Sequence, residues 1–114
     1  MSKAKHISVI GGVGHVGFPL GLILSAKGFK VNLIDKNLKN INKINRGEIP
    51  FIEKNSKNLL INMLKKKRIF ATNKLSEITK SKYIIICIGT PITNQLNPNL
   101  IKFISLFYDL KKFL

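Results

Sequence analysis

The chain has 114 residues, 45% of them hydrophobic, which gives it the length of one domain and enough apolar residues for a modest core. Its 20 basic residues outnumber 5 acidic ones, but only Arg46 and Arg68 are arginines in a chain also rich in asparagine and isoleucine. Proteins that read nucleic acids favour arginine for its bidentate geometry, so the composition argues against a nucleic-acid partner.

A single cysteine, Cys87, excludes an internal disulfide and favours a reducing compartment. Its apolar neighbours indicate an inert core residue rather than a catalytic thiol. No signal peptide is visible at the start of the sequence, and no apolar run approaches the roughly 20 residues of a membrane-spanning helix. We therefore expect a cytoplasmic protein without a membrane partner.

The first half of the chain alternates between strands and helices. A β-rich strand at 6–11 precedes a helix at 14–27, and a second strand at 30–35 precedes a helix that stops at Gly47. The apolar residues at helical spacing are Val16, Leu20, Ile23 and Leu24 in the first helix, and Leu38, Ile41 and Ile44 in the second. Apolar residues at this spacing form the face that a helix packs against the core.

The second half continues the alternation. Ser56 is the predicted N-cap of a third helix. The residues on the buried side of that helix are Leu59, Leu60, Met63 and Leu64. A strand at 68–72, a brief helix at 75–79 and a strand at 83–88 follow, and the unbroken apolar character of the last strand predicts cover on both faces. A helix with Asn97 as N-cap and Pro98 in its first turn runs to the end of the sequence.

Strands that alternate with helices pair in parallel through right-handed crossovers. The sequence therefore predicts a Rossmann-like α/β fold, with a doubly wound parallel sheet of about four strands in one unit at 1–114. In such a sheet, ligands bind beyond the carboxyl ends of the strands.

The glycines of Gly12-x-Gly14-x-x-Gly17 directly follow the first strand. In a dinucleotide-binding turn, Gly12 allows the tight turn, Gly14 lets the backbone approach a pyrophosphate, and Gly17 lets the helix pack close to the sheet. The helix N-terminus then offers backbone N–H groups and the positive end of its dipole to the phosphates. A purely structural role for the glycines is the alternative.

Asp35 ends the second strand about 20 residues after the glycines, where a carboxylate accepts hydrogen bonds from the adenosine ribose. A carboxylate also repels a 2′-phosphate, so the sequence predicts NAD rather than NADP as cofactor. The neighbouring Lys36 softens this preference without reversing it, and FAD is a lesser alternative.

Four stretches resemble the UDP-glucose/GDP-mannose dehydrogenases, the nucleotide-sugar 6-dehydrogenases, and they occur in the order of that family. These stretches are GGVGHVGFPLG at 11–21, NRGEIPFIEKN at 45–55, CIGTPI at 87–92 and NQLNP at 94–98. The resemblance covers essentially the whole chain. Within the family it points to the branch that acts on N-acetylated UDP-hexosamines.

The resemblance implies a set of residues that line the cofactor. They are Gly12, Val13, Gly14, His15, Val16, Gly17, Asp35, Gly89, Thr90 and Pro91. Asn40 stands near the position where the family often has a basic residue, and Lys36 and Lys39 lie close by. A helix-face role for His15 and a plain turn at Thr90 and Pro91 remain alternatives.

The family oxidises the C6 hydroxyl of a nucleotide sugar in two NAD-dependent steps and uses a cysteine to hold a thioester intermediate. The resemblance implies that this cysteine lies downstream of the sequence, because Cys87 falls within a strand. We therefore expect part of an NAD-binding domain, inactive alone, without catalytic residues, metal ligands or the substrate domains. A UDP-sugar partner and a homo-oligomer are expected only for a full-length protein.

The aromatic residues of the last helix, Phe103, Phe107, Tyr108 and Phe113, together with Leu114, are expected to form an exposed apolar face that favours association. Two other functions stay open: an NAD-binding fragment of a hydroxyacid-type dehydrogenase, and a non-enzymatic basic module that binds nucleic acid.

Overall fold

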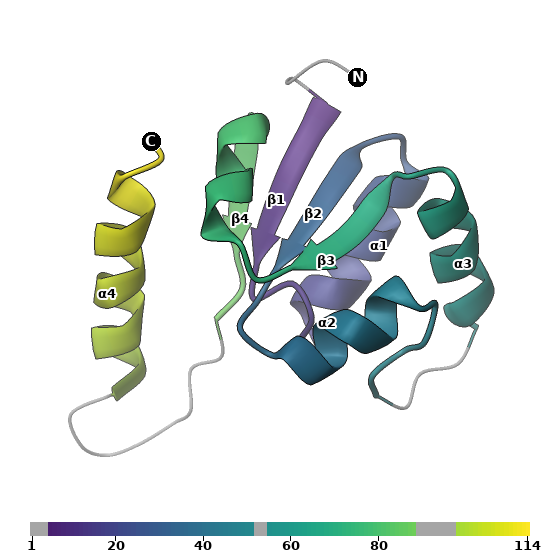
Figure 1. The fold of residues 1–114 in the computed structure, drawn as a ribbon, viewed down its shortest axis with the longest axis horizontal. Coiled ribbons are helices and arrows are strands. Elements are labelled where there is room, and N and C mark those ends of the chain that lie inside the picture. Colours follow the sequence, from purple (N-terminus) through teal and green to yellow (C-terminus); the bar gives the residue numbers. More distant parts are fainter. Residues whose placement is uncertain (1–4, 52–54, 89–97) are drawn as a thin grey trace.

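The computed structural model describes residues 5–51, 55–88 and 98–114, with four strands in one parallel sheet (Figure 1). The strands are β1 (His6–Ile10), β2 (Lys30–Ile34), β3 (Ile69–Thr72) and β4 (Tyr83–Ile86). Their order is β3-β2-β1-β4, and each neighbouring pair is parallel. From β1 the chain adds β2 and then β3 on one side of the sheet, and β4 then pairs with the opposite side of β1. This arrangement confirms the predicted Rossmann-like α/β fold.

Helices connect the strands and cover both faces of the sheet (Figure 1). They are α1 (Gly17–Ala26), α2 (Leu38–Asn45), α3 (Lys57–Lys65), the 3₁₀ helix η2 (Leu75–Lys80) and α4 (Pro98–Lys111). Gly28 and Gly47 follow α1 and α2 with φ of +106° and +83°, the left-handed conformation in which glycine commonly ends a helix. The predicted stops at these two glycines are confirmed.

The core consists of two apolar clusters, one on each face of the sheet. On one face, β1 to β3 pack against the three helices α1 to α3. The buried helix residues of this cluster are Phe18, Leu22, Ile41, Ile44, Leu60 and Met63. On the other face, Ile10 and Ile34 pack against Ile78 of η2 and Leu110 of α4. Successive side chains of a strand point to opposite faces, so both clusters draw on the same strands.

The predicted buried face of α1 is only partly correct, because Leu24 packs half-buried against the first cluster while Val16 and Ile23 do not. Val16 is 70% exposed and Ile23 is 56% exposed. The residues that α1 buries are Gly17, Phe18, Gly21, Leu22 and Ser25. The helix lies so close to the sheet that a Cβ on Gly21 would come within 2.5 Å of Leu33 Cδ2, so its glycine side faces β2. Glycine carries no hydrophobic signal, and the apolar periodicity therefore indicated the buried side only in part.

Two other burial predictions need correction. Leu38 is exposed at the first turn of α2, whereas Ile41 and Ile44 are buried as expected. Strand β4 has cover on both faces, since Ile85 packs against the first cluster and Ile84 and Ile86 against the second, but the cover is incomplete: these side chains are half-buried and Tyr83 is exposed. Among the described strands β4 lies at the margin of the sheet and pairs only with β1, which leaves its other side less covered.

Helix α4 packs on the sheet through Leu110, which is 2% exposed. Tyr108 and Leu114 are exposed, in agreement with the predicted apolar face, but Phe113 is half-buried against the second cluster. In the described parts of the chain, no helix is both long enough and apolar enough to cross a membrane.

Candidate functional site

The turn that follows β1 is fixed to the end of β2. The backbone N–H groups of Gly11 and Gly12 donate to the Ile34 carbonyl oxygen at 2.8 and 3.2 Å. Gly11 has φ +77°, and a Cβ at this position would collide with the Cys87 carbonyl group. A residue with a side chain rarely adopts this conformation, so the turn requires glycine here. Sequence reasoning missed Gly11, although the Gly11-Gly12 doublet was a visible signal.

The three glycines of the predicted fingerprint have different surroundings. A Cβ on Gly12 would lie 2.7 Å from the Val9 oxygen and 2.8 Å from Leu33 Cα, and one on Gly17 would collide with the Gly11 oxygen. A Cβ on Gly14 would meet only the Gly11 oxygen, at an ordinary 3.6 Å. Packing therefore requires glycine at Gly12 and Gly17 but leaves open space at Gly14. Open space at this position is what a phosphate needs in order to approach the protein backbone closely.

Asp35 follows β2 and lies beside this turn at the carboxyl edge of the sheet. Its Oδ2 accepts a hydrogen bond from the Val13 N–H at 3.3 Å. Its Oδ1 accepts hydrogen bonds from the N–H groups of Lys36 and Asn37 at 2.7 and 3.1 Å. A carboxylate has about four acceptor positions, so the half-buried Asp35 retains capacity for a hydroxyl donor.

Val13 is held from a second direction by α2. Asn37 caps this helix, since its side chain accepts a hydrogen bond from the Asn40 N–H at 3.1 Å. The Asn40 side chain in turn donates to the Val13 carbonyl oxygen at 3.4 Å. The Asn40 side chain thus supports the turn. The backbone N–H and C=O of Val13 are both engaged by residues from the end of β2 and the start of α2.

His15 and Val16 lie on the exposed side of the turn. The His15 ring packs against Phe51 with a centroid distance of 4.5 Å, and Phe51 also makes an edge contact with Phe18 at 5.8 Å. The segment before α3 therefore returns to the glycine turn, a contact that the sequence pattern did not reveal. Gly17 begins α1. In the first turn the Phe18 N–H donates to the Gly14 oxygen at 3.1 Å and Pro19 has no N–H, so the Gly17 N–H is the donor that faces an anion at this end.

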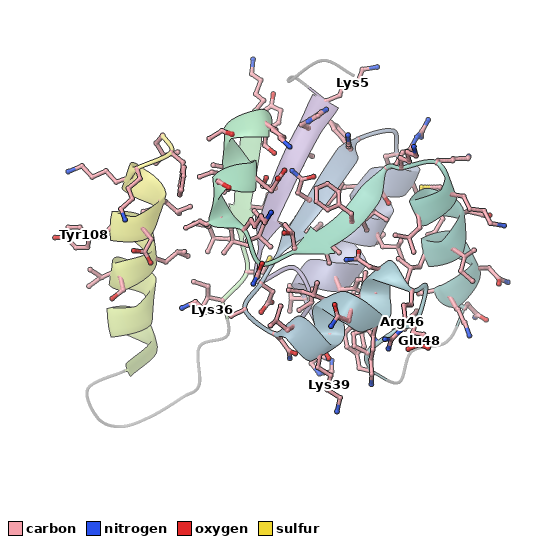
Figure 2. All side chains as sticks on the ribbon, in the orientation of Figure 1. Lys5, Lys36, Lys39, Arg46, Glu48 and Tyr108 are labelled. Carbon is pink, nitrogen blue, oxygen red and sulfur yellow. The ribbon has the colours of Figure 1, made fainter. Side chains whose placement is uncertain are left out.

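The two lysines near Asp35 are both exposed, and Figure 2 shows Lys36 and Lys39 at the end of the molecule opposite Lys5. Glu48 forms an ion pair with Arg46 at 3.2 Å (Figure 2). In the described parts of the chain, no three His, Cys, Asp or Glu side chains are grouped to hold a metal ion.

Three predicted cofactor residues, Gly89, Thr90 and Pro91, lie outside the described residues. The chain reaches them through Cys87, whose backbone N–H donates to the Ile10 oxygen at 2.7 Å next to the glycine turn. Burial raises the pKa of the Cys87 thiol, which disfavours the reactive thiolate.

A parallel sheet with a glycine turn, a helix N-terminus and a carboxylate at one edge defines a dinucleotide-binding domain of the Rossmann class. Residues 5–114 match the family described as the UDP-glucose/GDP-mannose dehydrogenase family, NAD binding domain. The chain belongs to this family, and its cofactor is NAD.

Named relatives agree with this assignment. The UDP-N-acetyl-D-mannosamine dehydrogenase of Methanococcus maripaludis is 32% identical over 87 residues, which cover 76% of this chain and 19% of the relative. The crystal structure of a GDP-mannose dehydrogenase from Pseudomonas aeruginosa is 30% identical, with a TM-score of 0.77 over 86% of this chain and 23% of that one. The NDP-N-acetyl-D-galactosaminuronic acid dehydrogenase of Methanosarcina mazei is 25% identical, with a TM-score of 0.83 over 100% of this chain and 28% of that one.

The chain spans between 10% and 20% of the length of the curated relatives that it matches.

Proposed function

We propose that the glycine turn and Asp35 bind NAD as the cofactor-binding part of a nucleotide-sugar 6-dehydrogenase. In this proposal, residues 1–114 are part of the NAD-binding domain of a cytoplasmic enzyme. The whole enzyme oxidises the C6 hydroxyl of a UDP-sugar to the acid and consumes two NAD. The groups that carry out the oxidation belong to parts of the enzyme beyond this sequence, since the raised pKa of Cys87 does not suit a nucleophile.

The observation that carries the proposal is the position of the Asp35 carboxylate. It lies at the carboxyl edge of the sheet, is tied to the glycine turn by the Val13 N–H at 3.3 Å, and keeps free acceptor positions. The adenosine ribose hydroxyls bind there, and the pyrophosphate lies over Gly14 at the start of α1. His15 and Val16 border the phosphates. Gly89, Thr90 and Pro91 are assigned to the cofactor from the family resemblance alone.

The substrate class is proposed from the relatives. Two of them are named for N-acetylated hexosamine derivatives and one for GDP-mannose. We therefore favour an N-acetylated UDP-hexosamine as the substrate. The second candidate is a nucleotide sugar whose hexose carries no N-acetyl group, as in GDP-mannose. The two alternative functions, a hydroxyacid-type dehydrogenase and a nucleic-acid-binding module, are not favoured, because the family match covers residues 5–114.

Calorimetric titration of the full chain with NAD tests the cofactor site. We expect binding to the wild-type chain, a loss of at least about tenfold in affinity for Asp35→Ala, and no change for Asp109→Ala. Asp109 is the matched control because it is an exposed aspartate on a different element, α4. Equal affinities of the wild type and Asp35→Ala would contradict the assigned site.

A further inference from the structure

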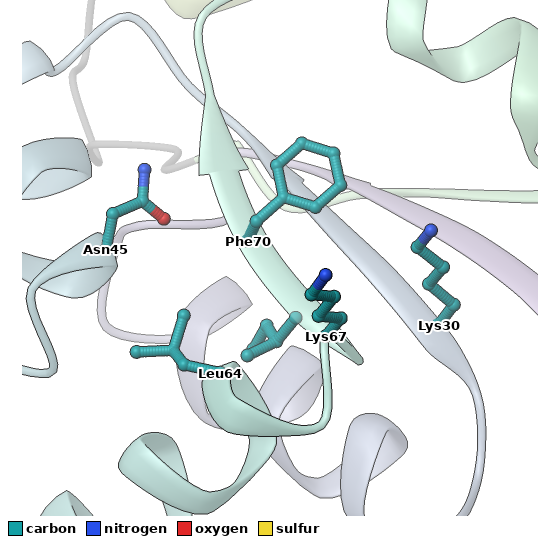
Figure 3. Close-up of a pocket in the computed structure, with 6 residues that line it drawn as sticks. Lys30, Asn45, Leu64, Lys67 and Phe70 are labelled. Atoms are coloured by element: carbon teal, nitrogen blue, oxygen red, sulfur yellow. The ribbon is translucent and has the colours of Figure 1, made fainter.

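A second concave site lies at the outer edge of the sheet, along β3. The cavity has a volume of about 400 Å³ and is lined by Lys30, Asn45, Leu64, Lys67, Ile69 and Phe70 (Figure 3). Lys30 begins β2, and Ile69 begins β3, so the cavity opens near the amino ends of these strands. Asp35 follows the opposite end of β2, which separates this cavity from the proposed cofactor site.

The lining combines an apolar wall with an aromatic ring. Leu64 is half-buried near the end of α3, Ile69 is buried, and Phe70 is half-buried on β3. In Figure 3 the Phe70 ring stands over the cavity, next to the Lys67 side chain. A half-buried phenyl ring on the margin of a concave site offers a surface on which a flat apolar group can pack.

The charged part of the lining is entirely positive. Lys30 and Lys67 both reach the cavity, and no lining residue is acidic (Figure 3). The ion pairs among the described residues join Arg46 to Glu48 and Lys80 to Glu77, so neither cavity lysine takes part in them. Two ammonium groups without a carboxylate partner favour an anion between them.

The surrounding edge of the sheet strengthens this positive potential. Parallel strands all begin at the same edge, and a basic residue stands at or just before the start of each one. These residues are Lys5, Lys30, Arg68 and Lys82. The pKa of His6 at this edge is lowered, mainly by burial and in the same direction by the positive charge of Lys30.

We propose that this cavity binds a small aromatic anion, with the ring against Phe70 and a phosphate or carboxylate between Lys30 and Lys67. The volume lies within the range of about 300 to 1,000 Å³ that is usual for small-molecule sites.

Fluorescence and ¹H–¹⁵N NMR titrations of the full chain with 1-naphthyl phosphate test the proposal. We expect saturable binding, with amide shifts centred on Lys30, Lys67 and Phe70. Inorganic phosphate and 1-naphthol, each of which has one half of the ligand chemistry, should bind at least about tenfold more weakly. The 1-naphthoate ion serves to distinguish a phosphate from a carboxylate preference.

Variants assign the binding to this cavity. The double variant Lys30→Gln/Lys67→Gln should lose about tenfold or more in affinity, and Phe70→Leu should lose affinity while it keeps an apolar side chain in β3. The matched control Lys36→Gln/Lys39→Gln removes the same charge at the opposite edge and should bind as the wild type does. Circular dichroism checks that each variant folds.

Two results would overturn the proposal. One is equal binding of 1-naphthol and 1-naphthyl phosphate, because it would remove any role for the lysines. The other is an equal loss of affinity in the two double-lysine variants, because it would show attraction to net charge alone. Asp35→Ala should leave this binding unchanged, so the result is independent of the proposed cofactor site.

Discussion

Asp35 and Val13 are joined by a hydrogen bond of 3.3 Å from the Val13 N–H to Asp35 Oδ2, so one carboxylate links the end of β2 to the turn that follows β1. The Val13 side chain is 1% exposed, and its carbonyl accepts from Asn40. The residue between two fingerprint glycines is therefore an anchor, and the turn keeps its shape before any cofactor arrives. Such preorganisation lowers the entropy lost on binding.

Asp35→Asn tests the charge of this carboxylate. The substitution keeps one acceptor oxygen but removes the negative charge that repels a 2′-phosphate. We expect affinity for NAD to fall about tenfold and affinity for NADP to fall less or to rise, because Lys36 is adjacent. The measurement is the ratio of the two dissociation constants, with Asp109→Asn as control. An unchanged ratio would show that Asp35 does not contact the ribose.

Gly14→Ala separates ligand binding from folding. A Cβ at Gly14 has open space, whereas one at Gly12 would lie 2.7 Å from the Val9 oxygen. We expect Gly14→Ala to melt within a few degrees of the wild type but to bind NAD at least about tenfold more weakly. Gly12→Ala should be strongly destabilised. Thermal melts and NAD titrations of both variants check this, and full NAD affinity in Gly14→Ala would contradict the proposed phosphate position.

Asn45→Ala tests how the β3 edge is protected. The Asn45 side chain donates to the Ala71 oxygen at 2.8 Å and accepts from the Ala71 N–H at 2.9 Å, so it pairs with β3 as a neighbouring strand would. Loss of both hydrogen bonds should lower the free energy of unfolding by about 1 to 2 kcal/mol. Urea unfolding measures this, and Asn42→Ala, an exposed asparagine on the same helix, should show little change.

His6 should make the stability depend on pH. Burial, followed by the charge of Lys30, lowers the pKa of His6 below its usual 6.5 in the folded chain. The unfolded chain therefore binds a proton more readily, and the free energy of unfolding should fall as the pH drops below about 6.5. Urea unfolding between pH 8 and pH 5 tests this. His6→Gln should reduce the dependence, whereas a reduction in the His15→Gln control instead would contradict the assignment.

Much of the architecture could be predicted from the sequence because its signals are local. The strand at 6–11, the glycine turn and the acid at Asp35 occur within one short stretch, and their spacing is set by the lengths of a strand and a helix. The family likewise followed from short motifs. The reading of Gly14 as a point of close ligand approach stays a prediction, which the open space beside it supports.

Other features depended on contacts between residues far apart in the chain. The face that α1 buries was set by the close approach of Gly21 to Leu33, and glycine leaves no trace in a hydrophobic pattern. The contact of Phe51 with His15 joins residues 36 positions apart, and Asn45 meets Ala71 across 26 positions. No local periodicity encodes such pairs.

The sequence by itself determined the order of the elements, the glycine turn after the first strand and the family, because local propensity and short-range spacing carry that information. Only the tertiary structure decided which side of α1 is buried. It also decided that Asp35 and Asn40 both hydrogen-bond to the Val13 backbone, and that Lys30 and Lys67 line the same cavity. The physical reason is that parallel pairing sets the register between distant segments, and that register determines which side chains become neighbours.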